Sequence, residues 1–315
     1  MAQTYADVWR TVKLHASAAP TFLVRDWVND AWKELTRFRP TANYLRSPQS
    51  SISIQAARTV TATATLGSTT ITSVGEFLST DVGRQFRFQT FPWYTIVAFT
   101  DISTVTIDRA FGEPDATASA SIYDGVFVVP SDFGQFEIIA DPYNQRRLAF
   151  WITQEQLNLL DPTRMSGDTG PRLLAAAGPS PVPATLGRQT FEYWPRPTAQ
   201  RTYPYYYFKQ AADLADSYVF TGAMAEAGDV LVDGALAKCA LWPGTSDKPN
   251  PFFQMSLADR YEKRFQDGLQ KLSLRDDDVA GSDYLRVNWD RWPLADLAYN
   301  DESLRSTDAT IADLY

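Results

Sequence analysis

Cysteine and histidine are almost absent from this chain of 315 residues, which has one of each, Cys239 and His15. A single cysteine excludes a disulfide within the chain and any zinc site built from several cysteines. A single histidine excludes a histidine-rich metal cluster and leaves one candidate for any imidazole-based catalysis. Cys239 falls on the apolar face of a predicted helix and His15 on the polar side of another, beside Leu14. We therefore expect no catalytic role for either residue, and no metal or cofactor.

Long apolar runs and an excess of positive charge are also lacking. No stretch approaches the roughly 18 apolar residues of a membrane-spanning helix, and the first residues lack the apolar segment of a signal peptide. The 29 basic and 37 acidic residues give a net charge of −8. Proteins that wrap nucleic acid neutralise phosphates with basic side chains, so tight nucleic-acid binding is disfavoured. These features predict a soluble protein that does not bind membranes and folds in a reducing cytoplasm.

Aromatic residues, in contrast, are plentiful and make up 13% of the chain. Such a content supplies packed cores and excludes wholesale disorder. At roughly 100–200 residues per domain, the length allows two or three domains.

Helices are predicted near both ends of the chain. In residues 1–46 apolar side chains recur at helical spacing on two stretches, and the second stretch stops at Pro40. A third amphipathic stretch begins near Leu257 and carries Gly268 on its apolar stripe. We expect these faces to pack together as the core of a helical body. The residues of that core are Trp27, Leu35, Phe38, Leu257, Tyr261, Phe265 and Leu269.

The segment between them has a different composition. Over 47–125 Ser, Thr, Val and Ile dominate, in six or seven short runs of period two separated by turn residues. This pattern predicts a small β-sandwich or barrel, inserted between the helical segments. Residues 126–274 mix further strands, a short helix over 153–160 and the returning helices. The predicted fold class is α+β: a helical-bundle adaptor body with an inserted all-β module and an extended C-terminal tail.

The tail, residues 275–315, contains ten acidic residues and four arginines. A purely acidic segment would be solvated, but large aromatic residues recur here at irregular intervals. Exposed aromatics of this size usually mark a contact site. We predict that the tail is extended and becomes ordered when it docks on a neighbouring subunit or another protein of the same assembly. The candidate assembly contacts are Tyr284, Trp289, Trp292, Tyr299 and Tyr315.

Motifs of the common enzyme classes are missing, including the phosphate-binding and dinucleotide-binding loops, the zinc-protease helix and the nucleophile elbow. Two carboxylate chemistries stay open. A pair of carboxylates joined by the fold could hydrolyse glycosides beside exposed tryptophans. The acidic run at 276–278 could bind a divalent cation, although a solvated junction after a helix is the simpler interpretation. Proline-flanked aromatics at 91–94, 193–197 and 203–208 belong either to a core or to a subunit interface.

Several short motifs follow one another over residues 1–273. After the helices and the β segment come Val129-Pro-Ser-Asp-Phe133, then Phe191-Glu-Tyr-Trp-Pro-Arg-Pro197 and the aromatic strand at 203–208. Asp233-Gly-Ala-Leu-Ala-Lys238 and Tyr261-Glu-Lys-Arg-Phe265 complete the series. In this order, the motifs resemble the head–tail connector (adaptor, or neck) proteins of tailed bacteriophages.

The resemblance implies a virion structural protein without enzymatic activity, assembled in the host cytoplasm. Such proteins form a ring, commonly of twelve subunits, between the portal protein and the tail or other neck proteins. DNA passes through the lumen without tight binding, which suits an acidic chain. Two alternatives remain: another tail component of the tail-tube type, and a carbohydrate-binding or carbohydrate-hydrolysing protein that uses a carboxylate pair. The mass of the assembled particle separates a closed ring from a monomeric hydrolase.

Overall fold

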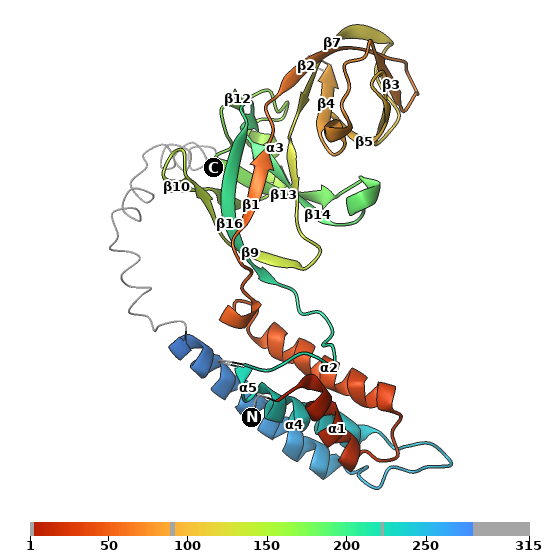
Figure 1. Cartoon of the computed structure of the whole chain (residues 1–315), viewed down its shortest axis with the longest axis vertical. Helices are drawn as coiled ribbons and strands as arrows, with labels where there is room; N and C mark the ends of the chain where they lie inside the picture. The colour runs from red at the N-terminus through yellow and green to blue at the C-terminus, as the bar shows by residue number, and fades with distance from the viewer. Residues whose placement is uncertain (1–2, 89–91, 222–223, 280–315) are drawn as a thin grey trace. The chain divides into compact units, whose positions relative to one another are not determined.

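The computed structural model describes residues 3–88, 92–221 and 224–279 (Figure 1). These residues form two compact units. Among the described residues, the helical unit contains those up to 48, 132–135 and 207–279, and the β unit contains those within 49–131 and 136–206.

Four α-helices and one short 3₁₀ turn build the helical unit. They are α1 (Tyr5–His15), α2 (Thr21–Phe38), the 3₁₀ turn η1 (Asn43–Leu45), α4 (Ala227–Leu241) and α5 (Met255–Val279). A capping box starts α1, since the Thr4 hydroxyl accepts from the Asp7 backbone N–H and the Asp7 carboxylate accepts from that of Thr4. Helix α4 contacts each of the other three. Its small and apolar side chains on nearly all sides suit this central position.

The core of the helical unit brings together side chains from all four helices. Trp27 and Leu35 of α2 and Phe265 and Leu269 of α5 are buried, as the sequence predicted. Phe38 is an exception with 48% exposure, because it is the last residue of α2 and lies beyond the packed part of the helix. Leu257 and Tyr261 are likewise only half-buried.

Six strands of the β unit close into a barrel with the order β2-β3-β6-β5-β4-β7. Antiparallel pairing of β2 with β7 along the full length of β2 closes it. Side chains alternate on β2, where Val60, Ala62 and Ala64 point into the barrel core. The strands are β2 (Arg58–Ala64), β3 (Thr70–Ser73), β4 (Gln85–Phe88), β5 (Tyr94–Asp101), β6 (Thr104–Ile107) and β7 (Ala116–Tyr123), with a 3₁₀ turn, η2 (Ser79–Asp81), before β4.

Two further four-stranded sheets flank the barrel in sequence. One has the order β1-β16-β9-β10 and the other β11-β13-β14-β8. Their strands are β1 (Ser50–Ile54), β8 (Val126–Val128), β9 (Phe133–Asp141), β10 (Arg146–Arg147), β11 (Ala149–Ile152), β13 (Leu173–Pro179), β14 (Gln189–Trp194) and β16 (Arg201–Lys209). Helix α3 (Gln154–Leu160), a 3₁₀ turn η3 (Pro183–Thr185) and a two-stranded pair of β12 (Gly167–Asp168) with β15 (Arg196–Pro197) complete the unit.

The expected fold class is wrong in its main element. The described residues contain five α-helices, but strands dominate and a helical bundle is not the body of the protein. The physical reason is long-range pairing: Ser50 of β1 lies opposite Tyr205 of β16, and β11 pairs in parallel with β13. Such pairing leaves little signal in short strands separated by irregular loops. Helical periodicity, in contrast, is visible within one turn or two.

Candidate assembly surface

The two residues that the sequence set aside as catalytic candidates have structural surroundings. Cys239 is fully buried on α4, and burial raises the pKa of its thiol. The Asn250 side chain donates a hydrogen bond of 2.8 Å to the Cys239 carbonyl and so fastens the loop after α4. His15 ends α1 with its ring centroid 5.6 Å from that of Phe252.

Buried carboxylates of the β unit are held by cations or N–H groups. Asp81 accepts hydrogen bonds from the guanidinium groups of Arg58 and Arg84 at the base of the barrel. Burial opposes ionisation of Asp161, but hydrogen bonds from Ser166 and Met165 outweigh it, and the pKa of Asp161 is lowered. A glycosidase acid needs a raised pKa, so Asp161 does not fit that role.

The acidic run at the end of α5 was expected to be a solvated junction, and for Asp276 this is wrong. Asp276 is 1% exposed and lies inside α5, which continues to Val279. Its carboxylate accepts from the Asn43 backbone N–H at 3.0 Å and lies 3.7 Å from the Arg39 guanidinium. Asp276 therefore fastens α5 to the segment after α2. Across the part of the chain that the structure describes, no group of three His, Cys, Asp or Glu side chains has the arrangement of a metal site.

Hollows in the two units differ in size. A cavity of about 10 Å³ in the β unit is lined by Tyr123, Arg164, Glu192 and Arg196, among others. It has room for one water molecule and not for a substrate. Arg164 and Glu192 form a buried ion pair there at 2.5 Å.

A larger groove of about 310 Å³ lies open on the helical unit. Phe22, which is 67% exposed, and Leu214 line it together with an ion pair of Arg25 and Asp216. The Arg25 guanidinium also lies 4.9 Å from the centre of the Trp9 ring. The groove is a shallow surface feature of mixed polarity.

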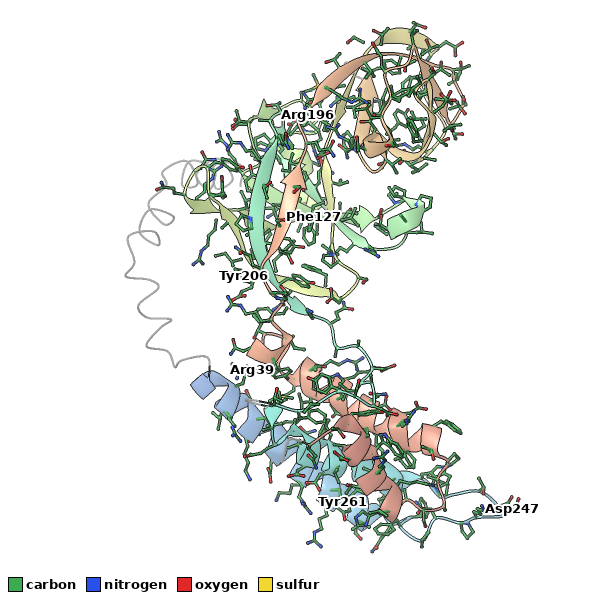
Figure 2. The ribbon with its side chains drawn as sticks, viewed as in Figure 1. Arg39, Phe127, Arg196, Tyr206, Asp247 and Tyr261 are labelled. Carbon is green, nitrogen blue, oxygen red and sulfur yellow. The ribbon has the colours of Figure 1, made fainter. Side chains whose placement is uncertain are left out.

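Most of the proline-flanked aromatics in the described residues are buried, while Trp93, Trp194 and Tyr206 are half-buried. Tyr203, Tyr205 and Tyr207 of β16 are at most 5% exposed. The Tyr205 ring lies 5.5 Å from that of Phe127, which Figure 2 labels, and 5.8 Å from that of Phe136. Core packing is therefore the correct interpretation of this strand.

One end of the helical unit exposes apolar side chains. The end of α4 lies beside the start of α5 there, since the Gln254 backbone N–H donates a hydrogen bond of 3.1 Å to the Ala240 carbonyl. The end of α1 lies beside the loop before α5, since the His15 ring centroid is 5.6 Å from that of Phe252. Figure 2 labels Asp247 in the loop that leaves this end. We define the end patch as Leu14, Leu241, Phe253 and Met255, which are 82%, 51%, 56% and 70% exposed. Exposed apolar residues that gather in this way are typical of contact sites.

The assembly contacts predicted from the sequence, at positions 284, 289, 292, 299 and 315, lie outside the described residues. The end patch was missed. Its residues lie at helix ends and in the loop before α5, where the sequence does not distinguish an apolar side chain that faces solvent from one that faces the core.

Of the helices in the described ranges, none combines the length and the apolar character that crossing a bilayer requires. A comparison of the sequence with models of known protein families finds no match. A search of curated proteins finds none either.

Proposed function

We propose that this protein is a structural subunit of a tailed-bacteriophage virion, a head–tail connector that forms a ring between the portal protein and the tail. The end patch carries the proposal. Its four apolar side chains are each more than half exposed, and they lie at helix ends and in the loop before α5, where a neighbouring subunit can reach them without unfolding the chain.

Two other observations support the same role. The short motifs that resemble connector proteins occur over residues 1–273 in the same order as in that family. The net charge of −8 suits a lumen through which DNA passes, because an acidic wall repels phosphates and does not retain them. A structural ring needs surfaces that bind its neighbours, and the end patch supplies one such surface.

The mass of the full-length protein in solution tests this function. Twelve copies of a 35.3 kDa chain weigh about 420 kDa, and we expect mass photometry to find a closed ring that negative-stain images show as an annulus. Changing Phe253 and Met255 to Glu should weaken assembly at least tenfold by placing charge in the contact.

The matched control changes Val74 and Ile102 to Glu, because these side chains are 93% and 60% exposed on turns of the barrel. The control should assemble like the wild type, and both variants should melt like it at the monomer level. A wild-type chain that stays monomeric at all concentrations contradicts the proposal. So does an end-patch variant that assembles as well as the wild type.

A further inference from the structure

Helix α5 carries a basic stripe on its solvent-facing side. Five exposed basic residues recur at helical spacing: Arg260, Lys263, Arg264, Lys271 and Arg275. Such spacing places them on one face of the helix, with Asp267 and Leu274 between them. From Arg260 to Arg275 this stripe extends along about 22 Å of helix at 1.5 Å per residue. We call it the α5 stripe; Tyr261, labelled in Figure 2, lies along its edge.

Two members of the stripe have ionic partners within the helical unit. Arg264 lies 3.2 Å from the Asp233 carboxylate of α4, and Arg275 forms an ion pair with Glu226. Within the described ranges Arg260, Lys263 and Lys271 have no ionic partner. Among the described residues, three cations on one helix face therefore have no ionic partner, in a chain whose net charge is −8.

The C-terminal segment of the chain has the complementary character. Residues 280–315 contain seven acidic residues and three arginines, a net charge of −4, together with the aromatics Tyr284, Trp289, Trp292, Tyr299 and Tyr315. The negative charges of these acids are opposite in sign to the cations of the stripe. Leu274, which is 68% exposed within the stripe, offers an apolar contact to an aromatic ring.

We propose that the α5 stripe binds the acidic C-terminal segment, residues 280–315, of a second copy of the chain. This inference rests on the proposed function, because each subunit of a ring has two neighbours. The C-terminal segment of one neighbour would bind the subunit's α5 stripe, and the subunit's own segment would bind the α5 stripe of the other neighbour. An interface of this kind is heterologous, and a closed ring satisfies every copy of it. The contact depends on salt, since the basic side chains of the stripe are exposed.

Charge-reversed variants of the full chain test the inference. The stripe variant carries Lys263→Glu and Lys271→Glu, and the segment variant carries Asp290→Lys and Asp296→Lys. The control variant carries Arg188→Glu and Lys248→Glu, which change the net charge as much as the stripe variant does, at exposed positions outside the stripe. Sedimentation velocity measures self-association at low and at high salt.

We expect the stripe and segment variants each to self-associate at least tenfold more weakly than the wild type and the control at low salt. Mixing these two variants should restore association, because each then meets an oppositely charged partner in the other chain. One chain that carries all four reversals should regain association as well. High salt should reduce the difference between the wild type and the variants.

Other outcomes overturn the inference. If the four-reversal chain recovers stability but the mixture does not associate, the segment binds the stripe of its own chain. If the wild type binds duplex DNA through the stripe, and the charge reversals leave the strength of self-association unchanged, the stripe binds nucleic acid. A ring that forms equally in all variants contradicts this inference alone, whereas a monomeric wild type also contradicts the proposed function.

Discussion

Close packing between α4 and α5 depends on Gly268, and a double substitution tests this dependence. A Cβ atom placed on Gly268 would lie 2.8 Å and 2.9 Å from the two methyl carbons of Val230 and 3.4 Å from its Cβ. These three nearest atoms all belong to Val230. The conflict therefore resides in two methyl groups of one side chain.

The magnitude follows from two opposing effects of Gly268→Ala. Alanine improves the intrinsic helix propensity by about 1 kcal/mol. Overpacking against Val230 costs about 1–3 kcal/mol. The net result in the wild-type background is a loss of up to about 2 kcal/mol in the free energy of unfolding. In a Val230→Ala background the methyl groups are gone, so the same change should stabilise by about 1 kcal/mol.

Urea unfolding followed by far-UV circular dichroism measures all four members of this cycle. The coupling energy between the two sites should be about 1–3 kcal/mol. Gln270→Ala, at an exposed site on α5, serves as the control and should change stability by no more than about 0.5 kcal/mol in either background. If Gly268→Ala has the same effect with and without the Val230 methyl groups, the packing argument is wrong.

Three further predictions concern the two units. Phe265→Ala should cost about 3–5 kcal/mol of stability, since Phe265 is 1% exposed, and an unchanged melting temperature would refute its place in the core. Replacing residues 58–123 with a short Gly-Ser linker should leave the helical circular dichroism signal intact. The cut ends are adjacent, because the Gln55 backbone N–H donates to the Asp124 carboxylate at 2.6 Å. Complete loss of the helical signal would contradict this prediction. The lowered pKa of Asp161 means that its ionised form stabilises the fold above the ordinary carboxyl pKa, and this contribution is lost as the pH falls through the folded value. Asp161→Asn should therefore be less stable at neutral pH and less sensitive to acid than the wild type, and an identical acid-unfolding curve would refute the reasoning.

The boundaries of that excision depend on the fold. The sequence predicted an inserted β segment over 47–125, but removing all of it would also remove β1, which pairs with β16. β16 would then keep β9 but lose its other neighbouring strand along five residue pairs. A cut between Gln55 and Asp124 avoids this loss.

The sequence by itself determined the features that depend on neighbours within a few turns of chain. Helical spacing placed Phe265, Gly268 and Leu269 on one stripe of α5, and all three face the interior of the helical unit. The Thr153 capping box, whose side chain accepts from the Gln156 backbone N–H at 3.2 Å, starts α3 where a short helix was predicted. These signals are local, so no knowledge of the rest of the chain is needed to interpret them.

Only the tertiary structure decided which distant segments pair and which apolar residues are covered. The fold class failed because the partner of β1 lies about 150 residues away at β16, and short strands do not specify partners at that distance. Asp276 was interpreted as a solvated acid, yet the Asn43 backbone N–H and Arg39 from the segment after α2 cover it. Met255 and Phe253 have the same apolar character as buried residues, yet they are exposed because none of the described elements covers them. Burial and pairing depend on the packing of whole elements, which the sequence pattern of a single element does not contain.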